Sequence, residues 1–284
     1  MSLASGRRRF AALLFAVLFA SAALPRAPCF AAAPQPAASA QPTVNVTLPW
    51  LAGMARFIVG STMKIQPVAT WNASGVLRTA RKLPQNATVI ALDPIDALKF
   101  GISKGQEGLY LLYDNLPIEE PQRGAISFNP SILPFLSQRL LIVLCKLSPD
   151  NYSFYQRRVA EFQSRLESAV EVGRSLVQDT HILDLSSSVS PWVRSSMPNA
   201  VRPPDELWSA WSSGNRISDL ELAAKEAEKR NWWILLDAWT PAPIRTRVSG
   251  LPMSILIGPP EADYDFFAYL HNIYLQIWSR AVEK

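Results

Sequence analysis

The stretch from Asn151 to Val177, NYSFYQRRVAEFQSRLESAVEVGRSLV, decides the fold of this chain. Its apolar residues recur at steps of three, four and seven, which keeps them on one face of an α-helix for about seven turns, or roughly 40 Å. Charged residues stand between them and form a solvated face, with pairs such as Glu161 and Arg165 four positions apart. A helix this long spans a whole lobe, so we expect it to join two lobes.

Strands and helices alternate on both sides of this helix. Before it, the pattern predicts strands at 43–48, 63–70, 87–92 and 108–113, and helices at 54–59 and 130–147. After it, the pattern predicts strands at 181–185, 232–236 and 254–257, and helices at 191–196, 204–211, 217–230 and 263–282. Such alternation favours mostly parallel sheets with right-handed crossovers.

The sequence therefore predicts an α/β protein with two lobes, each with a mostly parallel sheet flanked by helices. We expect residues 41–147 to form the N-terminal lobe, 148–178 the long linking helix, and 179–284 the C-terminal lobe.

The N-terminal segment has the pattern of an export signal. Arg7 to Arg9 are followed by the apolar run Phe10 to Leu24 and by small residues with Ala-x-Ala spacing. Residues 31–42 are rich in Ala, Pro and Gln, which is typical of a spacer. We interpret residues 1–40 as a signal peptide and spacer, with a retained N-terminal anchor as the alternative. The expected location is periplasmic or extracytoplasmic.

Composition limits the classes of function. The net charge of +5 includes the leader arginines, and no basic stripe indicates nucleic-acid binding. No stretch after residue 24 is long and apolar enough to span a membrane. Cys145 is the one cysteine that remains after the leader, so no internal disulfide is expected. We expect a monomer.

No pattern of catalytic residues is present. The sequence lacks a phosphate-binding glycine loop, a G-x-S-x-G elbow, an HExxH motif and paired cysteines. His181 and His271 lie far apart, and we interpret both as structural. The sequence therefore predicts no catalytic residues and no enzyme.

Candidate ligand contacts follow the predicted strands, because open α/β sheets bind ligands at the carboxyl ends of their strands. The candidates are Asp93, Asp114, the Ser186–Ser188 turn, Asp237 and Gly258, joined by Trp71, Trp192 and Trp239. Each has a structural alternative. The aspartate before proline can cap a helix, the serines can start one, and each tryptophan can anchor packing.

Several strings, in order along residues 43–284, resemble the solute-binding proteins of zinc/manganese ABC importers. They are Gln85–Ile90 before a strand, Ser127–Pro130 before a buried helix, Leu147–Asn151 at the start of the long helix, and the terminal helix Tyr264–Val282. The resemblance implies the two-lobed fold, export, and delivery of cargo to an ABC permease at the membrane.

The resemblance also implies a metal held between the lobes by three histidines and one carboxylate. Those positions fall near Asn72, Ala125, Ser187 and Gly258, and none is a histidine or a carboxylate. Neutral oxygens from such residues cannot offset the desolvation of a divalent ion. The resemblance thus implies zinc or manganese, but the ligands are missing, and we expect a degenerate metal site.

Two functions remain. The first is a periplasmic solute-binding-type protein of an ABC transporter, whose cleft is relined by Trp71, Asn72, Asp93, Ser187, Trp192 and Asp237 for a metal ion or small solute. Aromatic faces with carboxylates suit a cationic or polar organic solute. The alternative is a non-transporting accessory or partner-binding protein on the same scaffold.

Overall fold

The computed structural model describes residues 41–84, 86–116, 118 and 123–282 of the 284-residue chain. The predicted signal peptide and spacer, residues 1–40, lie outside the described residues. Among the described helices, none combines the length and apolar character needed to cross a membrane.

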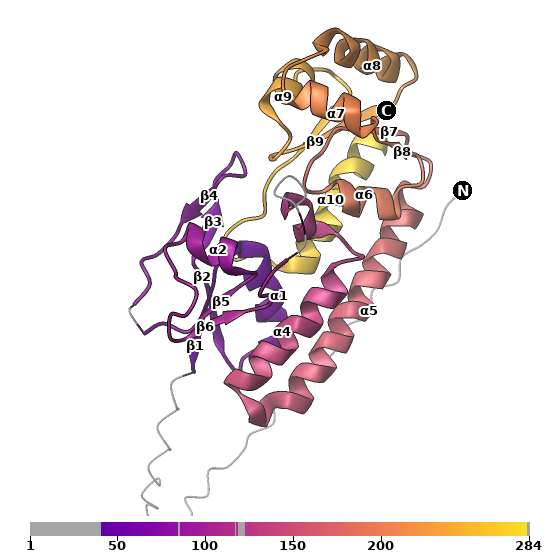
Figure 1. Ribbon diagram of the computed structural model, residues 1–284. Helices are drawn as coiled ribbons and strands as arrows, with labels where there is room; N and C mark the ends of the chain where they lie inside the picture. Colours follow the sequence, from indigo (N-terminus) through magenta and orange to yellow (C-terminus); the bar gives the residue numbers. More distant parts are fainter. Residues whose placement is uncertain (1–40, 85, 117, 119–122, 283–284) are drawn as a thin grey trace, which may run out of the picture. The chain divides into compact units, whose positions relative to one another are not determined.

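The N-terminal lobe is built on a four-stranded parallel sheet in the order β2-β1-β5-β6 (Figure 1). Its strands are β1 (Thr43–Val46), β2 (Lys64–Pro67), β5 (Val89–Ala91) and β6 (Leu109–Leu111). Its helices are α1 (Pro49–Val59), α2 (Pro94–Lys99) and α4 (Leu133–Leu147), with the 3-10 helix η1 (Gly124–Phe128) before α4. An antiparallel hairpin of β3 (Ala69–Trp71) and β4 (Leu77–Thr79) follows β2.

Strand β5 shows why this sheet needs helices on both faces. Val89 and Ala91 belong to one apolar cluster, which includes Ala97 and Ile102, whereas Ile90 belongs to the main core. All three strand residues are fully buried. A strand buried on both faces is typical of parallel sheets covered by helices on both sides.

The C-terminal lobe repeats this architecture with a parallel sheet in the order β10-β9-β7-β8. Its strands are β7 (Ile182–Asp184), β8 (Ala200–Val201), β9 (Trp233–Asp237) and β10 (Ser254–Ile257). Its helices are α6 (Ser190–Ser196), α7 (Asp205–Ser212), α8 (Ile217–Lys229), α9 (Ala242–Val248) and α10 (Phe266–Val282). The predicted α/β fold with two parallel sheets is confirmed.

The long helix α5 (Tyr152–Val177) follows the 3-10 turn η2 (Pro149–Asn151) and joins the lobes (Figure 1). It contacts α1 and α4 of the N-terminal lobe and α6 and α10 of the C-terminal lobe. Of the predicted apolar stripe (Tyr152, Tyr155, Val159, Phe162, Leu166, Val170 and Val177), the structure buries Tyr155, Val159, Phe162, Leu166 and Val177, and it leaves Val170 partly buried. Ala169 and Gly173 are buried as well and were not predicted. Tyr152 is an exception at 51% exposed.

Helices α5 and α10 approach closely at one glycine. A Cβ atom added to Gly173 would lie 2.2 Å from Cζ of Tyr274 on α10. The Tyr274 ring cannot retreat easily, because it stacks on Trp192 with ring centroids 5.6 Å apart. The absence of a side chain at Gly173 therefore allows α5 and α10 to approach this closely.

Three local features differ from the predicted elements. Helix α1 begins at Pro49 rather than at Met54, because a proline suits the first turn of a helix. The strand predicted over 63–70 divides at Val68 into β2 and β3. Helices α2 and α9 and the short strand β8 were not predicted; each has at most seven residues, too few to show a clear period.

Candidate functional site

A pocket of about 270 Å³ lies beyond the carboxyl ends of β1 and β5, between the N-terminal lobe and the first loops of the C-terminal lobe. This is where open α/β sheets bind ligands. Its lining residues are Leu48, Trp50, Trp71, Gly75, Leu77, Leu92, Asp96, Lys99, Arg123, Gly124 and Ser127 from one side, and Ser188 and Trp239 from the other.

An aromatic cluster of Trp71, Phe128, Trp239 and Tyr269 borders this pocket. The ring centroids of Trp71 and Trp239 lie 5.4 Å apart in an edge-to-face arrangement. Phe128 lies 5.8 Å from Trp239 and 5.2 Å from Tyr269. These separations are those of favourable aromatic pairs, so the cluster stabilises contact between the lobes.

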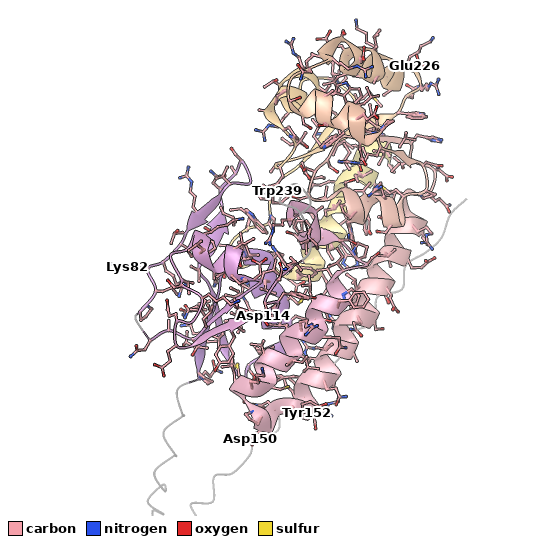
Figure 2. All side chains as sticks on the ribbon, in the orientation of Figure 1. Lys82, Asp114, Asp150, Tyr152, Glu226 and Trp239 are labelled. Atoms are coloured by element: carbon pink, nitrogen blue, oxygen red, sulfur yellow. The ribbon has the colours of Figure 1, made fainter. Side chains whose placement is uncertain are left out.

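Trp239 also forms a direct hydrogen bond between the lobes, and Figure 2 labels it there. Its indole Nε1 donates to the backbone oxygen of Gly75 in the β3–β4 hairpin at 2.9 Å. Gly75 has φ of +73°, and a Cβ atom there would lie 2.9 Å from the same Nε1. The hairpin therefore needs glycine at this position both for its backbone conformation and for the approach of the indole.

Asp96 is the buried carboxylate that lines the pocket, at 2% exposed. Its Oδ2 accepts hydrogen bonds from the Thr47 hydroxyl and from the Leu92 backbone N–H, the latter at 3.1 Å. Burial raises the pKa of Asp96, an effect that the two hydrogen bonds oppose. No described residue donates to its second oxygen, Oδ1.

Asp93 holds the start of α2 and an arginine together. Its Oδ1 accepts from the Asp96 backbone N–H at 2.9 Å, which is a helix N-cap, and its Oδ2 forms an ion pair with Arg123. Asp93 is 1% exposed and does not line the pocket, whereas Arg123 does. The structural alternative for Asp93, a helix cap, is therefore what the geometry shows.

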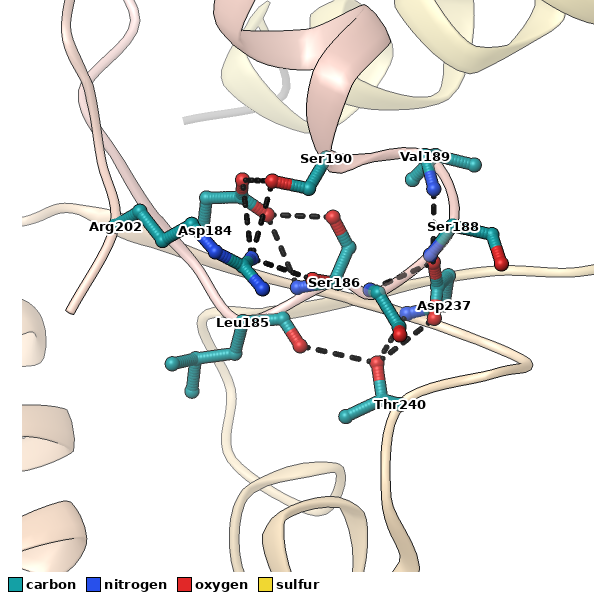
Figure 3. A network of polar contacts seen from close by, with 10 residues as sticks. Asp184, Leu185, Ser186, Ser188, Val189, Ser190, Arg202, Asp237 and Thr240 are labelled. Carbon is teal, nitrogen blue, oxygen red and sulfur yellow. Dashed lines mark hydrogen bonds and ion pairs between the residues drawn. The ribbon is translucent and has the colours of Figure 1, made fainter. Parts of the chain in front are cut away.

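Asp237, at the end of β9, is enclosed by donors (Figure 3). Its Oδ2 accepts from three successive backbone N–H groups, those of Ser187, Ser188 and Val189, at 2.9, 2.7 and 3.1 Å. Its Oδ1 accepts from the Trp239 backbone N–H at 3.1 Å and from the Thr240 hydroxyl at 3.0 Å. Burial raises the pKa of Asp237, and the donors act in the opposite direction.

A second buried carboxylate, Asp184, anchors the other end of the same loop (Figure 3). It accepts from the hydroxyl groups of Ser186 and Ser190 at 2.5 and 2.6 Å. Arg202 lies 3.7 Å from it and donates to the Ser186 backbone oxygen at 2.6 Å. The two carboxylates fix the path of the loop between β7 and α6, and through Asp237 they also position the backbone of Trp239.

The four positions that the resemblance assigns to metal ligands hold other roles. Asn72 Oδ1 accepts from the backbone N–H groups of Ser74 and Val76 at 3.0 and 2.9 Å, and so closes the hairpin turn. Ala125 offers no donor atom in its side chain. Ser187 presents its backbone N–H to Asp237, and the Gly258 oxygen accepts from the Tyr269 hydroxyl at 2.9 Å. None of these four residues lines the pocket.

The residues at these four positions do not fit zinc or manganese as ligands. Within the described part of the chain, no group of three or more His, Cys, Asp or Glu side chains could hold a metal ion. Zinc sites in proteins use three or four nitrogen, sulfur or oxygen ligands at close distances. The residues at the four expected positions cannot supply such a set.

The other predicted contacts divide between the pocket and the core. Trp71 lines the pocket, as does Trp239. Trp192 is fully buried against Tyr274, which corrects the expectation that it faces the cleft. Asp237 is also fully buried and serves the loop rather than the pocket.

Sequence reasoning missed Asp96, Arg123 and Ser127 as pocket residues. Asp96 has a local signal, because it stands three residues after Asp93 in the first turn of a helix that begins with proline. Arg123 and Ser127 come from a segment without periodicity, and only the folded chain brings them to the pocket.

Comparison with known proteins gives structural matches only. No protein-family model and no curated protein matches the sequence. The crystal structure of ZnuA matches with a TM-score of 0.58 at 14% identity, over 82% of this chain and 98% of that chain. A zinc-bound deletion mutant of ZnuA matches with a TM-score of 0.59 at 14% identity, over 84% of this chain and 96% of that chain.

A third match comes from Candidatus Liberibacter asiaticus. The cadmium-bound periplasmic metal-binding protein of that organism matches with a TM-score of 0.56 at 12% identity, over 84% of this chain and 98% of that chain. These values confirm at the level of the fold the resemblance found in the sequence. The chain has the fold of ZnuA and of periplasmic metal-binding proteins.

Proposed function

We propose that this protein is an extracytoplasmic solute-binding protein of an ABC importer, which carries a small organic solute rather than a metal ion to the permease. The proposal is supported by the fold shared with periplasmic metal-binding proteins and by the pocket between the lobes. The leader pattern of residues 1–40 agrees with export. We expect the protein to act as a monomer without catalytic activity.

The lining of the pocket carries the proposal. Indole rings of Trp50, Trp71 and Trp239 supply apolar faces, and a few polar side chains stand among them. Sites for organic ligands combine apolar walls with a small number of placed polar groups. A volume of about 270 Å³ corresponds to roughly nine water molecules at ~30 Å³ each, which is room for a small organic molecule.

Calorimetric titration tests the proposal. The protein is titrated with zinc chloride, with manganese chloride, and with a panel of small organic solutes that includes amino acids, amines, carboxylic acids and sugars. We expect binding of an organic solute, weakened by Trp71→Ala in the pocket but not by Trp278→Ala on α10, where the indole is 40% exposed. Tight stoichiometric zinc or manganese binding without any organic binding would refute the proposal.

A partner-binding protein without cargo is the second candidate. It is favoured by the hydrogen bond from Trp239 to Gly75 and by the aromatic cluster, because together they hold the lobes in contact without a ligand. The two functions differ in their complexes. A transport role predicts co-purification with a permease and its ATPase from membranes, whereas the second predicts another partner and no solute.

A further inference from the structure

Three polar groups in the pocket have no partner among the described residues. Oδ1 of Asp96 is one of them. The other two are the hydroxyl groups of Ser127 and Ser188, which line the pocket and take part in no hydrogen bond there. Ser127 and Asp96 are themselves 6% and 2% exposed. None of these three atoms is among the buried side-chain atoms that lack a partner, so each is open to the pocket and available to bond a polar ligand.

The Ser188 hydroxyl faces the pocket rather than the loop that Asp237 fixes. Figure 3 shows the Ser188 side chain directed away from Asp237, while its backbone N–H donates to that carboxylate. A Cβ atom added to Gly124, across the pocket, would lie 3.4 Å from Ser188 Oγ. The hydroxyl therefore lies beside the segment that begins η1 and that also carries Arg123 and Ser127.

Both signs of charge occur around the pocket. Arg123 and Lys99 line it as cations, and Asp96 lines it as an anion, while Asp93 behind them pairs with Arg123. Asp93 also accepts a hydrogen bond from the Asp96 backbone N–H, so Asp93 contacts both the cation Arg123 and the anion Asp96. A ligand with a net charge would face a like charge in a partly buried site, which is costly.

We propose that the pocket binds a small zwitterion of the amino-acid type. The ammonium group of the ligand donates to Asp96 Oδ1. Its carboxylate accepts from the Ser127 and Ser188 hydroxyl groups, beside the positive charges of Arg123 and Lys99. Its side chain packs against Trp71 and Trp239. This assignment rests on the proposed function and names the class of cargo.

The test uses ligands that differ by one charged group. L-phenylalanine is compared with phenethylamine, which lacks the carboxylate, and with 3-phenylpropionate, which lacks the ammonium group, and L-leucine is added as a second zwitterion. Titration calorimetry on the full chain should give binding of a zwitterion about 10- to 100-fold tighter than of either analogue, because each lost contact is a charge-assisted hydrogen bond.

Two variants locate the contacts. Asp96→Asn should remove most of the preference for L-phenylalanine over 3-phenylpropionate. Ser188→Ala, which breaks no hydrogen bond within the protein, should weaken L-phenylalanine and leave phenethylamine unchanged. Asp219→Asn is the matched control and should change neither, because Asp219 lies on α8 in an exposed ion pair with Arg216, the residue before that helix.

The outcomes separate this inference from the proposed function. If neither L-phenylalanine nor L-leucine binds more tightly than phenethylamine and 3-phenylpropionate, or if Asp96→Asn leaves the preference unchanged, the zwitterion assignment is wrong. The proposed function survives that result if another organic solute binds and Trp71→Ala weakens it. Both fail if zinc or manganese is the only ligand that binds.

Discussion

Replacing Asp237 by alanine should destabilise the protein strongly, because this carboxylate organises the loop between β7 and α6. Asp237→Ala leaves three backbone N–H groups, those of residues 187–189, without their acceptor; the groups of Ser188 and Val189 are buried and that of Ser187 is partly buried. Each unsatisfied group costs about 1–3 kcal/mol, which gives about 3–9 kcal/mol for three. Since the substitution also removes the desolvation cost of a buried charge, we expect the lower part of this range, about 3–5 kcal/mol.

Urea denaturation followed by tryptophan fluorescence measures this loss as a lower free energy of unfolding. Asp237→Asn should lie between wild type and Asp237→Ala, because an amide oxygen can still accept from the N–H groups. Asp263→Ala is the control, since that side chain is 90% exposed, and it should change the free energy of unfolding by less than about 0.5 kcal/mol. An Asp237→Ala protein as stable as wild type, but unable to bind solute, would refute the structural role and make Asp237 a ligand contact.

Three further predictions follow from glycine contacts and from one pKa. Gly75→Ala should lower the free energy of unfolding, measured by urea denaturation, more than Gly101→Ala does. The φ angles of the two glycines match, at +73° and +72°, but only a Cβ atom at Gly75 would meet an indole nitrogen, at 2.9 Å. Equal losses of unfolding free energy in the two variants would contradict the contact between the lobes. Gly173→Ala should lower the free energy of unfolding by about 1–3 kcal/mol or more, because the new Cβ atom overlaps the Tyr274 ring, although alanine has the better helix propensity. A melting temperature at or above that of wild type would exclude this packing. Burial raises the pKa of Asp96 above its ordinary value of 3.8, so the stability that the protonated carboxyl contributes is present below that pH and is lost as the pH rises through the folded-state pKa. This decline in the free energy of unfolding is at most about 1.4 kcal/mol per pH unit, and Asp96→Asn should flatten it. An unchanged slope above about pH 4 in the variant would contradict the prediction.

The parts of the fold that sequence predicted are those with long or repeated apolar periods. Helix α5 shows this best, because its buried stripe from Tyr155 to Val177 follows helical spacing throughout. Strands β5, β7 and β9 appear as short apolar runs because both faces of each sheet are covered. Short elements such as α2 and β8 were missed because too few residues carry the pattern.

The site was less predictable because its residues meet only through tertiary structure. The strand-end rule selected Trp71 and Trp239 as candidates, and both line the pocket. The same rule selected Asp93 and Asp237, yet both are occupied by internal hydrogen bonds that no spacing reveals. Asp96, one turn into α2, reaches the pocket because Asp93 caps that helix.

The expected degenerate metal site, in contrast, is a prediction from sequence alone, made at the four positions that the resemblance assigns to metal ligands. A site for a transition metal needs specific donor types, and their absence at Asn72, Ala125, Ser187 and Gly258 needs no coordinates to recognise. Structure adds a separate feature between the lobes: an aromatic cluster and a hydrogen bond from Trp239 that joins them.

Native mass spectrometry of the protein purified from the compartment in which it is made, run beside elemental analysis, shows whether the cargo is an organic molecule or a metal ion. We expect a mass increase from a small organic molecule and less than stoichiometric zinc and manganese. A protein that carries one tightly held zinc or manganese ion per chain, with no organic ligand, would contradict it.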